Sequence, residues 1–244
     1  MILRKWEDLP LEMQCDEVRP YYDILRKKQA TLIIKRLFDI IVSALMLVTL
    51  SPVFLILALA IKLDSKGSVF FRQVRVTRYG KRFWIFKFRT MIPNAEQYGT
   101  QVTVQNDVRI TRVGRFLRKY RLDEISQLID ILRGTMTFVG TRPEVPKYVA
   151  AYTPEMLATL LLPAGVTSEA SIRYKDEDKL LKGATDVDRV YIEKVLPAKM
   201  KWNLDSIRNF STVSELKTMA RTILALLAKD CEQTEHNKER EYIR

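Results

Sequence analysis

The sequence predicts an α/β domain, mostly helical with one small β-hairpin, that is attached to a membrane by a proline-broken helix. Three observations carry this prediction: a long apolar run near the N-terminal end, several segments with helical apolar spacing, and two short apolar stretches around a glycine turn. About 180 residues follow the apolar run, which suffices for one domain with its own core. The prediction therefore joins one membrane segment to one folded domain.

An apolar run extends from Leu37 to Ile61, with basic residues on both sides. Roughly twenty apolar residues can cross a bilayer, so length alone fits an ordinary transmembrane helix. Pro52 lacks the amide hydrogen that would bond the Val48 carbonyl, and Ser51 can offer its hydroxyl to the freed backbone groups, so we expect a sharp bend at Ser51-Pro52. Because Lys and Arg lie at both ends, the positive-inside rule places both ends on the cytoplasmic side. From the pattern alone, a re-entrant helix and a kinked transmembrane helix are equally open.

The segment before this run is rich in charge and aromatic rings, including Trp6, Tyr21 and Tyr22. Such residues are typical of a segment that rests at a membrane interface. An ordinary surface helix and loop explains them equally well.

After the apolar run, two apolar stretches within 69–88 flank Tyr79-Gly80-Lys81, which predicts two strands joined by a turn. The spacing over 112–120 predicts a basic amphipathic helix, which could lie on anionic headgroups or cover the core. The spacing over 122–132 predicts a helix that stops at Gly134.

Two further helices are expected toward the C-terminal end. One covers 186–196 and is ended by Pro197. The other begins where Thr212 and Glu215 have capping-box spacing, and its apolar face docks on the domain or on the membrane.

Composition limits the chemistry. The formal net charge of +12 calls for an acidic partner, and the membrane segment favours anionic lipid or a phosphate-rich substrate over nucleic acid. No nucleic-acid-binding motif is present, so we expect no nucleic-acid partner.

His236 is the single histidine, and Cys15 and Cys231 have no metal-ligand pattern around them, so histidine triads, zinc sites and a disulfide framework are not indicated. Catalysis must then rest on carboxylates, Arg and Lys.

Asp123 and Glu124 are adjacent at the start of the helix expected over 122–132. Two neighbouring carboxylates repel each other, which favours a bound cation such as Mg²⁺, a shifted pKa or nearby arginines. A carboxylate can also act as a nucleophile on phosphorus. The alternative is that the pair has no catalytic role, because acidic residues are common in first helical turns, where they complement the helix dipole.

Two basic segments are candidate phosphate sites. Lys87 and Arg89 alternate with apolar neighbours, so an extended strand would project both cations to one side, where they could hold a diphosphate. A solvated strand face is the alternative reading. Arg142 lies in Gly140–Glu144, which reads as a shaped loop because it combines a glycine and a proline.

Taken together and in order, these motifs resemble the bacterial sugar transferases, the monotopic phosphoglycosyl transferases. The resemblance runs from about Lys35 to the C-terminal helix. It rests on Lys35-Arg36-Leu37-Phe38-Asp39, Ser51-Pro52, Gly80-Lys81, Lys87-Phe88-Arg89-Thr90-Met91, Leu122-Asp123-Glu124, Gln127-Leu128, Phe138-Val139-Gly140 and Arg142-Pro143.

The resemblance implies an enzyme that moves a sugar phosphate from a nucleotide diphosphate sugar to a polyprenyl phosphate and releases a nucleoside monophosphate. It implies that Asp123 is the nucleophile that forms a phosphosugar-aspartyl intermediate, and that Glu124 assists by holding Mg²⁺ or by managing the acceptor's proton. Asp123 and Glu124 are the expected Mg²⁺ ligands. Arg89 and Arg142 are the expected phosphate neighbours, with Lys87 behind them.

The resemblance also implies a re-entrant helix–break–helix over 35–63 and a cytosolic catalytic domain over 64–228. From composition, we expect an interfacial segment over 1–34 before them and a charged tail over 229–244 after them. The expected partners are a nucleotide sugar, polyprenyl phosphate and membrane lipids, and a homodimer is compatible with the sequence. The expected location is the cytoplasmic face of a bacterial inner membrane. A basic membrane scaffold without catalysis and a phosphohydrolase of nucleotide sugars are the alternatives.

The sequence departs from the family's pattern at several positions. Thr141 stands where many members have proline, and Thr77 where many have glycine. The downstream segment Gly165–Tyr174 replaces a glycine-threonine-glycine-tryptophan run. Arg173 and Lys175 are candidates for contact with the donor, whose sugar and nucleotide are the least transferable part of the resemblance.

Overall fold

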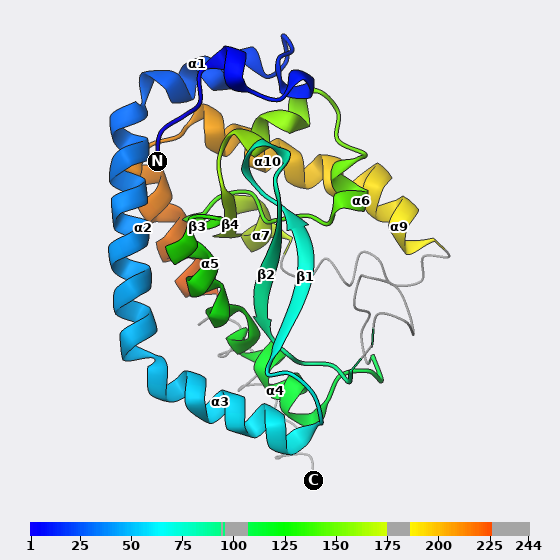
Figure 1. Ribbon diagram of the computed structural model, residues 1–244. Helices are drawn as coiled ribbons and strands as arrows, with labels where there is room; N and C mark the ends of the chain where they lie inside the picture. Colours follow the sequence, from blue (N-terminus) through cyan, green and yellow to red (C-terminus); the bar gives the residue numbers. More distant parts are fainter. Residues whose placement is uncertain (94, 96–106, 175–185, 226–244) are drawn as a thin grey trace, which may run out of the picture.

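The computed structural model describes residues 1–93, 95, 107–174 and 186–225. Two long helices, α2 (Gln29–Thr49) and α3 (Ser51–Asp64), border the domain, and shorter helices and two small sheets lie beside them (Figure 1). The predicted class, mostly helical with small sheets, is confirmed.

The first sheet is the expected hairpin. β1 (Phe70–Val76) pairs antiparallel with β2 (Arg82–Phe88). The turn between them uses two left-handed residues, Tyr79 at φ 60° and Gly80 at φ 69°. Glycine adopts this conformation readily, which explains why the local sequence predicted the turn.

The second sheet was not predicted. β3 (Met136–Val139) pairs parallel with β4 (Ala164–Thr167), which follows it by more than twenty residues in the sequence. A Cβ atom on Gly165 would lie 2.2 Å from the backbone nitrogen of Gly140, so the close approach of these two segments requires glycine.

The helices mostly follow the predicted segments. The segment expected over 122–132 is the 3₁₀ helix η5 (Leu122–Gln127) followed by α5, and Gly134 ends it at φ 83°. The remaining helices are α1 (Arg19–Lys27), α4 (Arg112–Lys119), α5 (Leu128–Arg133), α6 (Pro146–Val149), η6 (Glu155–Leu161), α7 (Glu169–Arg173), α9 (Val187–Val190), the π-helix η7 (Tyr191–Val195), α10 (Leu196–Arg208) and a helix over 212–225; short 3₁₀ turns cover Trp6–Asp8, Leu11–Met13 and Arg78–Gly80.

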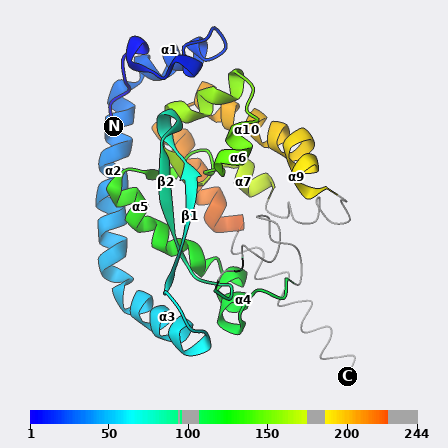
Figure 2. The same cartoon turned by 45° about the vertical axis from the view of Figure 1, so that its right-hand side comes forward.

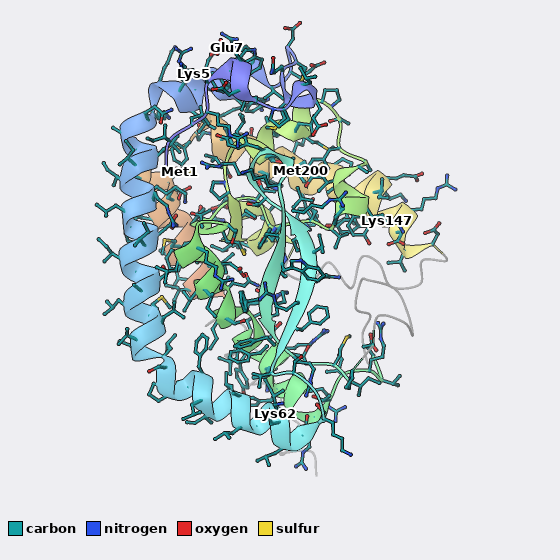
Figure 3. The ribbon with its side chains drawn as sticks, in the orientation of Figure 1. Met1, Lys5, Glu7, Lys62, Lys147 and Met200 are labelled. Atoms are coloured by element: carbon teal, nitrogen blue, oxygen red, sulfur yellow. The ribbon has the colours of Figure 1, made fainter. Side chains whose placement is uncertain are left out.

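The predicted bend is confirmed. α2 and α3 meet at 61°, and the Ser51 hydroxyl donates to the Val48 carbonyl at 2.8 Å. α3 then runs to its last turn, where Lys62 lies (Figure 3). No single helix in the described part of the chain has the length and apolar character to cross a bilayer, whereas α2 and α3 meet that test together. Their large exposed apolar side chains are Ile33, Ile34, Leu37, Ile40, Ile41, Leu45, Val48, Leu55, Ile56, Leu59 and Leu63.

The N-terminal segment differs from its prediction. Tyr21 and Tyr22 are 3% and 2% exposed and belong to a hydrophobic core that also contains Leu204 and Phe210. The Tyr21 hydroxyl donates to Glu155 at 2.5 Å. The segment before α2 therefore packs as part of the domain, where the sequence had suggested a membrane-interface segment over 1–34.

Two helix boundaries also differ. Pro197 does not end a helix; it lies in the first turn of α10, where a missing amide hydrogen costs nothing. The capping box at the last helix uses Ser211 and Ser214, whose side chains each accept from the other's amide at 3.0–3.1 Å. Glu215 pairs with Lys35 instead. The predicted tail over 229–244, which contains Cys231 and His236, lies outside the described residues.

Candidate active site

Asp123 and Glu124 lie in the first turn of η5, as the sequence predicted. Arg121, in the left-handed region at φ 56°, separates α4 from this turn and redirects the chain. Side chains of α5 and β2 share one core cluster, which fixes the helix to the strand: Leu128, Ile131, Phe83 and Ile85. The start of η5 is thereby held beside the end of β2.

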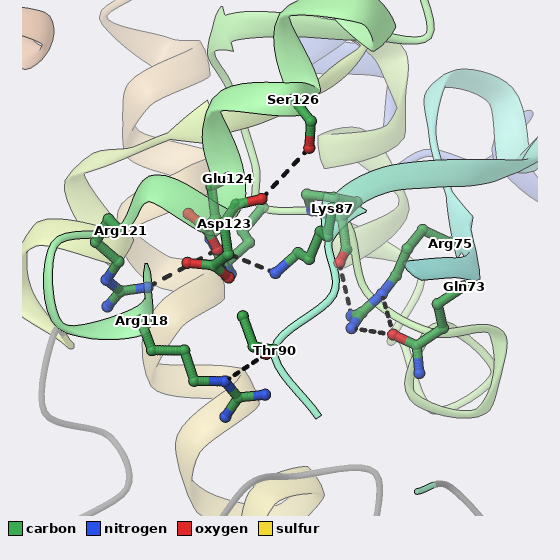
Figure 4. Close-up of polar contacts among 11 residues, drawn as sticks. Gln73, Arg75, Lys87, Thr90, Arg118, Arg121, Asp123, Glu124 and Ser126 are labelled. Atoms are coloured by element: carbon green, nitrogen blue, oxygen red, sulfur yellow. Dashed lines mark hydrogen bonds and ion pairs between the residues drawn. The ribbon is translucent and has the colours of Figure 1, made fainter. Parts of the chain in front are cut away.

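Glu124 is surrounded by cations. Its Oε1 atom accepts from Lys87 Nζ at 3.0 Å and from Arg142 Nη2 at 2.6 Å, and Arg121 Nη1 lies 3.8 Å away (Figure 4 shows Lys87 and Arg121). Burial alone would raise the pKa of Glu124, but Arg142 and Lys87 outweigh it and hold the pKa well below its usual range. Glu124 is therefore a fixed anion that organises the site.

Asp123 has a different environment although it is the adjacent residue. It is 8% exposed, and its Oδ1 atom has no hydrogen-bond partner among the residues that the structure describes. Burial raises the pKa of Asp123 and the Glu124 charge adds to the effect, whereas Lys87 and Arg118 oppose it. A buried carboxylate oxygen without a partner is rare and needs an explanation. An approaching phosphorus atom or a cation would supply one.

Two arginines of the site were not singled out from the sequence. Arg118 of α4 donates to the Thr90 hydroxyl at 2.8 Å and its charge acts on Asp123. A Cβ atom on Gly114 would lie 2.0 Å from the Thr90 carbonyl oxygen, so glycine allows α4 to approach the chain after β2. The basic spacing over 112–120 was the available signal, but it did not distinguish Arg118 from its neighbours.

Arg75 is the second. It donates to the Pro143 carbonyl at 3.1 Å and to Gln73 Oε1 at 2.6 Å (Figure 4). The loop that carries Arg142 is thus tied to β1. Nothing in the local sequence around Arg75 indicated that its side chain would bind the loop of Arg142.

The structure separates the predicted pair of cations. Lys87 faces Glu124, whereas Arg89 is 6% exposed and donates to the Ser65 carbonyl and hydroxyl at 2.7 and 2.9 Å. β2 ends at Phe88, so the strand alternation that would place Lys87 and Arg89 on one side does not continue. Arg89 therefore holds the end of α3, and the two cations have different partners.

The structure describes one of the two residues predicted to contact the donor. Arg173 is exposed at the end of α7, and its guanidinium stacks 3.7 Å from the centre of the Trp202 ring. Lys175 lies outside the described residues.

The carboxylates can be tested against the expected Mg²⁺. Among the described residues, no group of three or more His, Cys, Asp or Glu side chains lies together. Mg²⁺ often needs only one or two carboxylates when substrate phosphates complete its shell. Asp123 Oδ1 is an unpartnered oxygen, while Glu124 Oε1 is engaged by cations. The residues fit a Mg²⁺ that is shared with a phosphate substrate, and do not form a complete protein cage.

Comparison with known proteins identifies the family of this chain. The family model described as "Bacterial sugar transferase" matches residues 30–229. The chain belongs to this family. It is 35% identical over 199 residues to the UDP-glucose:undecaprenyl-phosphate glucose-1-phosphate transferase of Caulobacter vibrioides, covering 80% of this chain and 70% of that protein.

Other relatives of this sugar transferase differ in length. The enzyme of the same name from Escherichia coli K12 is 35% identical over 87% of this chain and 44% of its own length. The exopolysaccharide production protein PSS of Rhizobium leguminosarum bv. phaseoli is 34% identical over 81% of this chain and 97% of its own length. The chain spans less than half of the relatives from Klebsiella pneumoniae and Aeromonas hydrophila, at 40% and 44%.

Proposed function

We propose that this sugar transferase moves a sugar 1-phosphate from a nucleotide diphosphate sugar, a UDP-sugar, to undecaprenyl phosphate and releases the nucleoside monophosphate. The names of the relatives support the reaction class, since they are undecaprenyl-phosphate glucose-1-phosphate and N-acetylgalactosamine phosphotransferases. The observation that carries the proposal is the unpartnered, buried Oδ1 of Asp123 beside a cation-bound Glu124.

In the proposed mechanism, an Asp123 oxygen attacks the sugar-bearing phosphorus of the donor. The bond between this phosphorus and the bridging oxygen breaks, and the nucleoside monophosphate leaves with that oxygen. The phosphosugar remains on Asp123 as an acyl phosphate. A phosphate oxygen of the prenyl acceptor then attacks the same phosphorus and frees the Asp123 carboxylate, so both steps are displacements at one atom.

The cations of the site serve these displacements through charge. Phosphoryl transfer depends on in-line positioning and on neutralisation of the phosphate oxygens. Lys87, Arg118 and Arg142 lie around the two carboxylates and supply positive charge there. Glu124 holds Lys87 and Arg142 in place. A Mg²⁺ held by Asp123 and Glu124 with donor phosphate oxygens would add further neutralisation.

In this proposal the α2–α3 pair enters and leaves the membrane by the cytoplasmic face. Both helices expose large apolar side chains, they meet at 61°, and basic residues flank them at both ends. This arrangement places the site at headgroup depth, where a soluble donor meets a lipid-bound phosphate. The product would begin a lipid-linked glycan at the bacterial inner membrane, such as an exopolysaccharide.

The test is release of nucleoside monophosphate by the protein in nanodiscs, supplied with Mg²⁺, undecaprenyl phosphate and a panel of nucleotide sugars. Release that requires the acceptor and disappears in Asp123→Asn supports the proposal, with Asp205→Asn on the exposed face of α10 as the matched control. Release of free sugar phosphate without acceptor would indicate the phosphohydrolase instead. An Asp123→Asn protein that retains full activity in cells would indicate the scaffold.

Membrane topology is tested separately. Single cysteines near residues 32 and 66 are expected to react only with a reagent applied from the cytoplasmic side. Labelling of the two positions from opposite sides would show that the pair spans the bilayer.

A further inference from the structure

Three polar side chains of α2 have no part in the proposed reaction. Lys35 and Asp39 are only 8% and 2% exposed, and Arg36 lies between them, on a helix whose outward face is apolar. Buried ionisable groups are expected to have specific partners, and these partners show what the three residues hold.

Arg36 binds the C-terminal end of α5. Its Nη1 and Nη2 atoms donate to the carbonyls of Ile131 and Leu132 at 2.6 and 2.9 Å. The Ile131 carbonyl also accepts from the Gly134 amide at 3.0 Å, and the helix dipole favours a cation at this end of α5. Arg36 also lies against Gly134, since a Cβ atom on Gly134 would come within 3.1 Å of Nη2.

Asp39 and Lys35 bind β3. Asp39 accepts from the Thr137 hydroxyl at 2.7 Å and from the Phe138 amide at 3.3 Å. Lys35 Nζ donates to the Val139 carbonyl at 2.9 Å. Side chains of α2 therefore serve as partners for the backbone of this strand.

α5 and β3 form a bracket, which we define as residues 123–142 with its closed end at Gly134. The first arm contains Asp123, Glu124 and α5, and the second arm contains β3 and leads to Arg142. Arg142 donates to Glu124 at 2.6 Å, which joins the two open ends. α2 runs beside α5 in two views of the molecule (Figures 1 and 2), and its three polar side chains bind both arms next to the closed end.

We propose that Lys35, Arg36 and Asp39 are positioning residues. Through their contacts, the position of α2 against the domain determines how Glu124 and Arg142 lie relative to each other. The apolar face of α2, which includes the exposed Ile40 and Ile41, is the surface that lipid would contact. A lipid-dependent shift of α2 would thus reach the active site through the bracket. This inference rests on the proposed function for its turnover readout.

The test uses variants that remove single contacts from the bracket. Arg36→Met and Asp39→Asn are expected to lower kcat about tenfold with little change in donor KM, because small displacements of catalytic groups can cost up to about 100-fold in rate. Arg36→Lys is expected to recover part of the loss by donating to one carbonyl. Thr49→Val is the matched control, since within the described part of the chain its hydroxyl bonds only carbonyls of α2 itself.

Thr137→Val tests the same contact from the strand side and deletes one hydroxyl without changing a charge. Its effect on kcat is expected to be non-additive with Asp39→Asn, as for residues in direct contact. Equal losses in the control, or a folded Arg36→Met protein with wild-type kcat, would overturn the proposal.

Hydrogen exchange separates this inference from the proposed function. In both Asp39→Asn and Thr137→Val, the peptide over 136–142 is expected to exchange faster than in wild type, whether or not the donor is identified. A wild-type protein inactive on every donor would reject the proposed function. Unchanged exchange over 136–142 in both variants would reject the positioning contact itself.

Discussion

The ion pair between Glu124 and Arg142 provides the sharpest prediction for the active site. Arg142 donates through Nη2 to Oε1 at 2.6 Å and through Nη1 to Oε2 at 3.5 Å, while the Glu124 side chain is 10% exposed. Hydrogen bonds between charged groups contribute about 1.5–3 kcal/mol. Arg142 is 32% exposed and Lys87 still pairs with Glu124, so we take the lower value, about 1.5 kcal/mol.

Arg142→Met is therefore expected to lower the melting temperature by roughly 3–6 °C, given about 2–4 °C per kcal/mol for a chain of this size. Its kcat is expected to fall about 100-fold, as on removal of one charge-stabilising donor from a transition state. Arg142→Lys keeps the charge but loses the bidentate geometry, so its kcat is expected to lie between that of the wild type and that of Arg142→Met. Thermal unfolding and nucleoside monophosphate release measure both effects. A folded Arg142→Met protein with wild-type turnover would refute the role of this pair.

Three further predictions concern the carboxylates and the bend. Asp123→Asn is expected to abolish turnover without lowering the melting temperature, because it replaces a buried carboxylate by a neutral amide of the same shape at a position where Oδ1 has no hydrogen-bond partner among the described residues; a markedly destabilised variant would contradict this. Burial raises the pKa of Asp130 from 3.8 to about 6, so its contribution to stability is full below pH 3.8 and is lost as the pH rises through 6. Asp130→Asn is expected to remove this loss, and denaturant titrations at several pH values measure it. Pro52→Ala is expected to reduce the bend and to alter cysteine labelling near residue 66; unchanged labelling would show that Ser51 and the surrounding packing suffice.

The parts of the fold that were predicted depend on local sequence. The hairpin follows from apolar stretches around Tyr79-Gly80, and the stop at Gly134 from a glycine in the left-handed region. The pairing of β3 with β4 joins segments far apart in the chain, and no local pattern encodes it. For the N-terminal aromatic residues the sequence left a membrane interface and an ordinary surface helix open, and it did not predict that Tyr21 and Tyr22 lie in a core, because Tyr beside Arg suits both surroundings.

The same distinction applies to the site. Asp123, Glu124, Lys87 and Arg142 were selected from the order of short motifs, and the structure brings them together. Arg118 reaches the site only because α4 approaches the chain after β2, which is a tertiary contact. The direction of Arg89 depended on where β2 ends, and strand boundaries are poorly fixed by residue pattern.

The roles that we propose for Asp123 and Glu124 are argued from the different surroundings of the two side chains. In solution the two side chains would behave almost alike, yet here burial raises the pKa of Asp123 whereas Arg142 and Lys87 lower that of Glu124. Environments that shift the pKa values of two neighbouring carboxyl groups in opposite directions are typical of sites where the two groups have different catalytic roles. Glu124 is paired with Lys87 and Arg142, and an attack on phosphorus would require it to give up these ion pairs. Asp123 keeps an oxygen without a hydrogen-bond partner among the described residues, which supports its proposed role as the nucleophile.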